Sequence, residues 1–75
     1  MAQTKEGWIG AFGKKVGIEP PNEQEIDTLL SIAGVAAHAS ERSAAPLTCW
    51  MIAKAGITPE AALEIANEIA NESQS

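Results

Sequence analysis

The sequence has only one cysteine, one histidine, one arginine and one phenylalanine, and it has no tyrosine. A single cysteine excludes an internal disulfide framework and a zinc finger built on cysteines, which predicts a reducing, cytoplasmic location. No apolar run approaches the roughly 18 residues that cross a bilayer, and residues 1–6 lack the apolar stretch of a signal peptide. We therefore expect a protein without a membrane segment.

Basic residues are also few, because 5 lysines and arginines stand against 10 acidic residues. The isoelectric point is about 4.6. Binding to phosphates requires clustered basic side chains, so we expect neither nucleic acid nor a membrane surface as a partner. Glycine-rich phosphate loops, zinc-protease helices and calcium loops are absent as patterns. We expect no metal and no cofactor.

What the sequence contains is alanine, isoleucine, leucine and glutamate at helical spacing along almost all of its 75 residues. This length allows one domain, residues 1–75, with a core near the lower size limit for folding alone. Glycine and proline divide the chain into four segments. We predict an all-α fold, a compact bundle of four short helices over residues 4–16, 22–41, 46–55 and 58–72.

The helix boundaries carry recognisable start and stop chemistry. Asn22 and Glu25 have the spacing of a capping box, and Gly17 and Gly56 stand where left-handed residues end helices. The three glycines inside the first helix weaken it, so either tertiary packing holds this helix or a close backbone approach to a neighbour explains the glycines. The second helix is apolar on more than one face, so we expect it to be central and most buried.

Tryptophan and the apolar stripes indicate the core. We expect Trp8 and Trp50 to be core anchors, although tryptophan is also enriched at binding surfaces. Cys49 lies on an apolar helix and is expected to be a small core residue, with a thiol–base pair to His38 as the alternative. The expected inner face of the fourth helix is Ala62, Ile65, Ala66, Ile69 and Ala70.

Two polar features are candidate sites. His38, Glu41 and Arg42 lie at helical steps of three and four at the end of the second helix, just before Pro46. They fit a structural role at the helix end, or a site for a carboxylate or phosphate. Catalysis with His38 as base and Arg42 as anion holder is a third reading that needs a pocket. A ridge of acids on the last helix is either a solvated face or a docking surface for a basic partner: Glu60, Glu64, Glu68 and Glu72.

Residues 33–48, which read AGVAAHASERSAAPLT, resemble the signature of a small actinobacterial-type domain family of unknown function. The resemblance singles out His38, Glu41, Arg42, Pro46 and Thr48, and Trp8 and Gly56 also fit it. Cys49 departs from the hydroxyl or aliphatic residue expected after Thr48. Some relatives in that family are joined to nucleotidyltransferase-like domains that attach a nucleotide to molybdopterin, which implies a role near molybdenum cofactor maturation.

These observations lead to one functional hypothesis and its alternatives. We expect a non-catalytic accessory or protein-binding domain, not an enzyme, whose partner is a protein such as a molybdenum-cofactor enzyme or a nucleotidyltransferase. The expected binding residues are the five polar and proline positions that the resemblance singles out. One alternative is a small self-associating structural protein that forms a homodimer. Another is an anion- or nucleotide-binding domain that uses His38 and Arg42.

Overall fold

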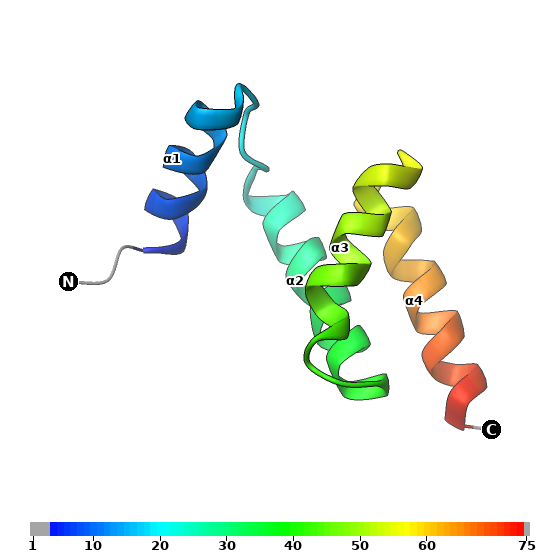
Figure 1. Cartoon of the computed structure of the whole chain (residues 1–75). Helices are drawn as coiled ribbons and strands as arrows, with labels where there is room; N and C mark the ends of the chain where they lie inside the picture. The colour runs from blue at the N-terminus through cyan, green and yellow to red at the C-terminus, as the bar shows by residue number, and fades with distance from the viewer. Residues whose placement is uncertain (1–3, 75) are drawn as a thin grey trace.

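The computed structural model describes residues 4–74, which form four α-helices and no strand. Helix α1 spans Lys5–Val16, α2 spans Glu23–Ala39, α3 spans Ala44–Ala55 and α4 spans Pro59–Gln74. The prediction of an all-α fold with four helices is confirmed. In Figure 1, α2, α3 and α4 are grouped together and α1 stands to one side of them. Within the described part, no helix is long and apolar enough to cross a membrane.

Helix α1 begins and ends with local hydrogen bonds. The Thr4 hydroxyl accepts from the Gly7 amide at 3.0 Å. Gly17, at a φ of 78°, is left-handed, and the amides of Gly17 and Ile18 donate to the Gly13 carbonyl at 2.8 and 2.9 Å. A Cβ atom at Gly13 would lie 2.7 Å from the Ile18 carbonyl oxygen. Of the two explanations for the glycines, close backbone approach therefore applies at Gly13, where the neighbour is the turn that follows the helix.

The capping box predicted at the start of α2 is present. The Asn22 side chain accepts from the Glu25 amide at 2.8 Å, and the Glu25 carboxylate accepts from the Asn22 amide at 2.8 Å. These two bonds satisfy backbone donors that the first turn of a helix leaves free. They fix the point at which the chain leaves the Glu19, Pro20, Pro21 linker and enters α2.

The core lies where α2 packs against both α3 and α4. Ile32 on α2 is 0% exposed, Ile52 on α3 is 8% exposed and Ala62 on α4 is 4% exposed. Leu29, Leu63 and Ala66 are half-buried around them. Helix α2 is therefore the central helix, as the sequence predicted.

The junction between α2 and α3 is shifted toward the N-terminus relative to the prediction. Helix α2 ends at Ala39 rather than 41, and α3 begins at Ala44 rather than 46. Ser40 leaves the helical conformation, with φ −135° and ψ −103°. Pro46 becomes the third residue of α3, which still lies in the first turn, where a missing amide breaks no intrahelical bond.

Two expectations about the core were wrong. Trp8 and Trp50 are 61% and 64% exposed, because α1 has no extensive packing contact with the other helices and Trp50 lies on the outer side of α3. Ile65 and Ile69, which were expected on the inner face of α4, are 46% and 55% exposed. Helix α4 contacts α2 through its smaller residues and Leu63, since small side chains allow closer approach of two helices.

Candidate functional site

The predicted polar cluster lies at the surface of the α2–α3 junction. His38 is in the last turn of α2, Glu41 and Arg42 are in the connecting turn, and all three are exposed. The Glu41 carboxylate accepts from the Ser43 hydroxyl at 3.0 Å. The carbonyls of Glu41 and Arg42 accept from the amides of Ala44 and Ala45 at 2.9 and 3.2 Å. In this junction the backbone of the turn thus supports the start of α3.

The side chains of His38, Glu41 and Arg42 do not form a network with one another. Across residues 4–74, the ion pairs and hydrogen bonds include none between any two of them. His38 lines a depression of about 380 Å³ between α2 and α4, together with Val35 and Asn67, and Arg42 is not part of its wall. The two residues that an anion site was expected to combine therefore do not face one cavity.

Pro46 and Thr48, the remaining predicted residues, have separate surroundings. Pro46 is exposed in the first turn of α3. The Thr48 hydroxyl is half-buried and donates to the Ala44 carbonyl at 2.8 Å. Thr48 also lines an apolar hollow between α3 and α4, and it is the one predicted site residue that does so.

This hollow, which we term the α3–α4 groove, runs between the two helices that both pack on α2. Its main part has a volume of about 300 Å³ and is lined by Thr48, Met51, Ile52, Ala55, Ile57, Ala62, Ile65, Ala66 and Ile69. An adjoining hollow of about 220 Å³ shares Thr48, Ala66 and Ile69 and continues toward Ser40 and Ala44. The groove therefore extends from the α3–α4 turn to the α2–α3 junction.

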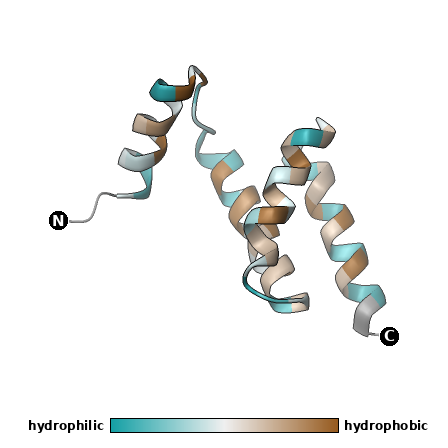
Figure 2. Cartoon of the chain, in the orientation of Figure 1, coloured by the Kyte–Doolittle hydropathy of each residue, from teal (hydrophilic) through white to brown (hydrophobic). Residues whose placement is uncertain are grey.

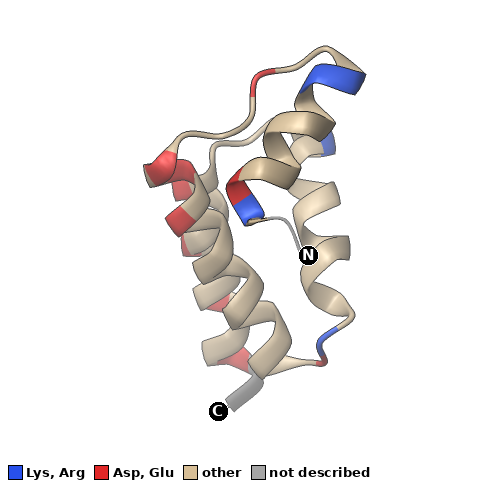
Figure 3. Ribbon diagram, turned by 90° about the vertical axis from the view of Figure 1, so that its left-hand side faces the viewer, with Lys and Arg blue, Asp and Glu red and all other residues tan. Residues whose placement is uncertain are grey.

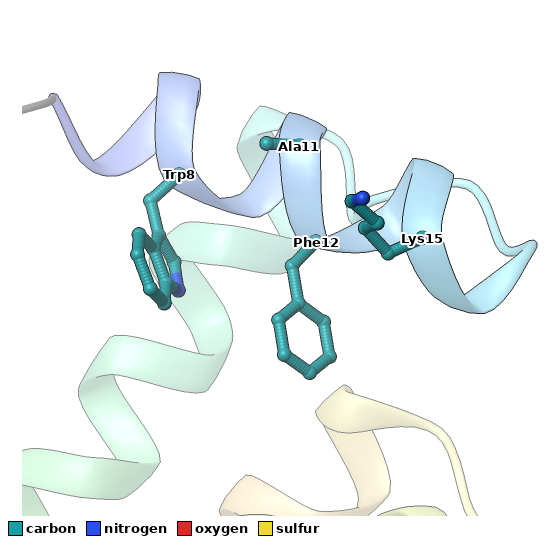
Figure 4. A pocket seen from close by; sticks show the side chains of 4 residues that line it. All are labelled: Trp8, Ala11, Phe12 and Lys15. Atoms are coloured by element: carbon teal, nitrogen blue, oxygen red, sulfur yellow. The ribbon is translucent and has the colours of Figure 1, made fainter.

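A second apolar surface lies on α1. Trp8 and Phe12 project from the same side of the helix, and Lys15 follows them along it (Figure 4). These residues line a shallow hollow of about 170 Å³. Another hollow of about 270 Å³ lies between Trp8, Phe12 and the chain at Ile18 and Pro21. We call the surface formed by Trp8, Phe12 and Lys15 the α1 face.

The four helices all carry hydrophobic residues, but α1 differs from the rest of the chain in its net charge. Figure 2 shows hydrophobic residues on all four helices, including α1, which stands apart. In Figure 3, acidic segments lie along α2 and α4, and basic segments lie at both ends of α1, on α3 and in the α2–α3 turn. Helix α1 carries three lysines and one glutamate, a net charge of +2, whereas the rest of the chain carries nine acids and two bases, a net charge of −7.

Other titratable side chains in the described residues include an ion pair, a cation–ring contact and a free thiol. Lys5 and Glu6 form an exposed ion pair at 2.7 Å; their hydrogen bond lowers the pKa of Glu6 and raises the pKa of Lys5. The Lys54 ammonium lies 5.8 Å from the centre of the Trp50 ring. Cys49 is a half-buried free thiol. In the described residues, no group of three or more histidine, cysteine, aspartate or glutamate side chains is arranged to hold a metal ion.

The α3–α4 groove and the α1 face were not predicted as sites. Their sequence signal is the spacing of Trp8 with Phe12, and of Ile65 with Ile69, at four residues. The same spacing is typical of a core stripe, and we interpreted it in that way.

Comparison with known proteins identifies one family. The model of the family described as a domain of unknown function (DUF6457) matches residues 1–75. No curated protein and no solved structure matches the chain.

Proposed function

The chain belongs to the DUF6457 family of unknown function, and we propose that it is a non-catalytic domain that binds another protein through the α3–α4 groove. The observation that carries the proposal is the groove itself. Met51, Ile65 and Ile69 are 63%, 46% and 55% exposed on one continuous hollow. Large apolar side chains gathered in a groove are typical of protein interaction sites.

The exposed polar residues at the α2–α3 junction form the edge of this proposed interface. Ser40 and Ala44 line the end of the groove that lies next to Glu41 and Arg42. An apolar centre with an exposed polar rim is the common anatomy of a protein interface. In this proposal His38, Glu41, Arg42 and Pro46 contact the rim of the partner, and Thr48 lies inside the groove.

The test is affinity recovery of proteins from extract of the native host. Ile65→Glu places a charge in the groove, and Asn71→Glu adds the same charge at an exposed position of α4. We expect recovery of a partner to fall at least about tenfold with Ile65→Glu, because a charge would be buried unpaired, and to persist with Asn71→Glu. Equal recovery with both variants contradicts the proposal.

The rim has its own test. Arg42→Ala is expected to weaken partner recovery by less than about tenfold, since rim charges contribute little to affinity. The thermal midpoint is expected to be unchanged, because Arg42 is exposed and surface substitutions usually change stability by less than about 0.5 kcal/mol. If recovery is the same as for the native chain, Arg42 has no role in binding.

A finer proposal follows from the resemblance of residues 33–48 to the actinobacterial-type family. In it, the protein is cytoplasmic, and a molybdenum-cofactor enzyme or a nucleotidyltransferase binds at the polar rim beside the groove. The support for this step is the sequence signature alone. The test is co-elution of the tagged chain with a molybdopterin nucleotidyltransferase domain, and separate elution of the two contradicts it.

A further inference from the structure

We infer that the partner in the α3–α4 groove is the α1 helix of a second copy of this chain, so that two chains exchange their α1 helices. The inference rests on the proposed function, because it names the occupant of the same groove. It combines three observations, which are the excess surface of the chain, the isolation of α1 and the complementary charges of the two surfaces.

The first observation is the area that the chain leaves uncovered. Its accessible surface is 5968 Å², whereas a compact monomer of 7.8 kDa has about 4,400 Å². The excess is about 1,600 Å², twice the roughly 800 Å² that each partner buries in a standard interface. The radius of gyration agrees, since it is 13.4 Å against about 11 Å for a compact domain of this length. A dimer of two such chains has ample surface to bury.

The second observation is that α1 has no extensive packing contact with another helix in the described residues. It has 12 residues with three glycines inside it. Isolated helices of this length are marginal in water, and each interior glycine costs about 1 kcal/mol relative to alanine. Helix α1 therefore needs to pack on a surface that its own chain does not provide in this structure.

The groove of the same chain is on the wrong side to receive α1. Figure 1 shows α1 on one side of α2 and α4 on the other. The intervening Glu19, Pro20, Pro21 segment is stiff, and Gly13 packs directly against Ile18 and Pro20 at its start. A second copy meets no such restriction. Two copies related by a two-fold axis fill both grooves, which gives a closed dimer.

The third observation is that the two surfaces have opposite charges at their edges. Lys15 lies beside Trp8 and Phe12 on the α1 face. Glu68 and Glu72 follow Ile65 and Ile69 by three residues on α4, so they are neighbours of the groove wall on the helix surface. A contact between residues 23–74 of two copies would bring together two net charges of −6, from eight acids and two bases each, whereas an exchanged α1 brings a charge of +2 onto each acidic surface.

The first test is the molar mass of the full chain by analytical ultracentrifugation over a range of concentrations. We expect a dimer whose dissociation constant rises at least about tenfold for Phe12→Glu on the α1 face and for Ile65→Glu in the groove, because each buries an unpaired charge. Gly10→Glu is the control on α1, where a new side chain meets open space, and Asn71→Glu is the control on α4. Circular dichroism confirms that each variant keeps its helices.

A mixture of the Phe12→Glu and Ile65→Glu variants tests whether two copies exchange their α1 helices. Phe12→Glu keeps an intact groove and Ile65→Glu keeps an intact α1 face, so a mixed dimer retains one good contact. We expect the mixture to form dimers more tightly than either variant alone. A mixture that dimerises no better than the separate variants overturns the inference.

Charge reversal at two exposed positions tests the contact between α1 and the groove without any effect on the core. Lys15→Glu and Glu68→Lys are each expected to weaken the dimer, and the double variant is expected to restore it. A native chain that sediments as a monomer at every concentration overturns the inference. The proposed function survives that result if Ile65→Glu still abolishes recovery of a different protein, and it fails separately if Ile65→Glu changes nothing.

Discussion

At the scale of single residues, stability depends on very few side chains. Ile32 is the only large side chain that is completely buried among the described residues. A domain of 75 residues has a total stability of about 4 to 11 kcal/mol. One core residue therefore accounts for a large part of what keeps α2, α3 and α4 together.

Ile32→Ala is expected to destabilise the protein by about 2–5 kcal/mol, through lost burial and the cavity that remains. Leu30→Ala is the control on the same helix, because Leu30 is 54% exposed, and it is expected to cost well under half as much. Urea unfolding followed by circular dichroism measures both. A loss below about 1 kcal/mol for Ile32→Ala would mean that the core lies elsewhere.

Gly13 is a residue where the usual effect of alanine in a helix reverses. Gly10→Ala meets open space and is expected to stabilise α1 by about 0.5–1 kcal/mol. Gly13→Ala places a Cβ 2.7 Å from the Ile18 carbonyl oxygen, so the turn after α1 must shift. We expect the amides of Gly17 and Ile18, which donate to Gly13, to exchange hydrogen faster in Gly13→Ala. Slower exchange, as in Gly10→Ala, would show that the turn accommodates the methyl group.

At the scale of elements, the helices and their ends were predictable because their causes are local. The capping box of Asn22 and Glu25 and the left-handed Gly17 and Gly56 depend only on neighbours in the sequence. Which apolar face of a helix is buried in the core was not predictable in the same way. A stripe such as Ile65 and Ile69 has the same spacing whether it meets a core or lines a groove, and only the packing of α4 on α2 decides between them.

Local spacing also failed to predict how the polar side chains at the α2–α3 junction are arranged. Helical spacing correctly places His38 near Glu41 and Arg42 along the chain, but α2 ends at Ala39 and the turn separates the side chains. An interacting triad required the helix to continue to residue 41. Local sequence did not reveal that Ser40 would break it.

The capping box of α2 gives the prediction at this scale. Asn22→Ala removes the side-chain acceptor of the Glu25 amide and is expected to cost about 1 kcal/mol. Asn22→Asp keeps an acceptor at the same place and is expected to retain most of the stability. Thermal unfolding compares the two variants. Equal losses in both would mean that the amide group of Asn22, rather than its capping oxygen, stabilises the helix start.

At the scale of the whole molecule, the chain divides into a three-helix body and an α1 segment of opposite charge (Figures 1 and 3). Each half has an apolar surface that it does not cover itself. The small core of the body and the weakness of isolated α1 then have one common explanation. In the exchange of α1 that we propose, both are parts of an assembly whose second half is another copy, and stability is expected to depend on protein concentration.

The two tryptophans allow this to be tested in the native assembly without an added label. Trp8 lies on the α1 face, whereas Trp50 lies on the outer side of α3 beside Lys54, and both are about equally exposed, at 61% and 64%. Trp50→Phe leaves Trp8 as the only tryptophan, and Trp8→Phe leaves Trp50. With rising concentration, acrylamide quenching of Trp8 is expected to fall as the helix enters the groove of the second copy, while quenching of Trp50 stays constant. Protection of Trp50 instead of Trp8 would place the contact on the outer side of α3 and contradict the exchange of α1.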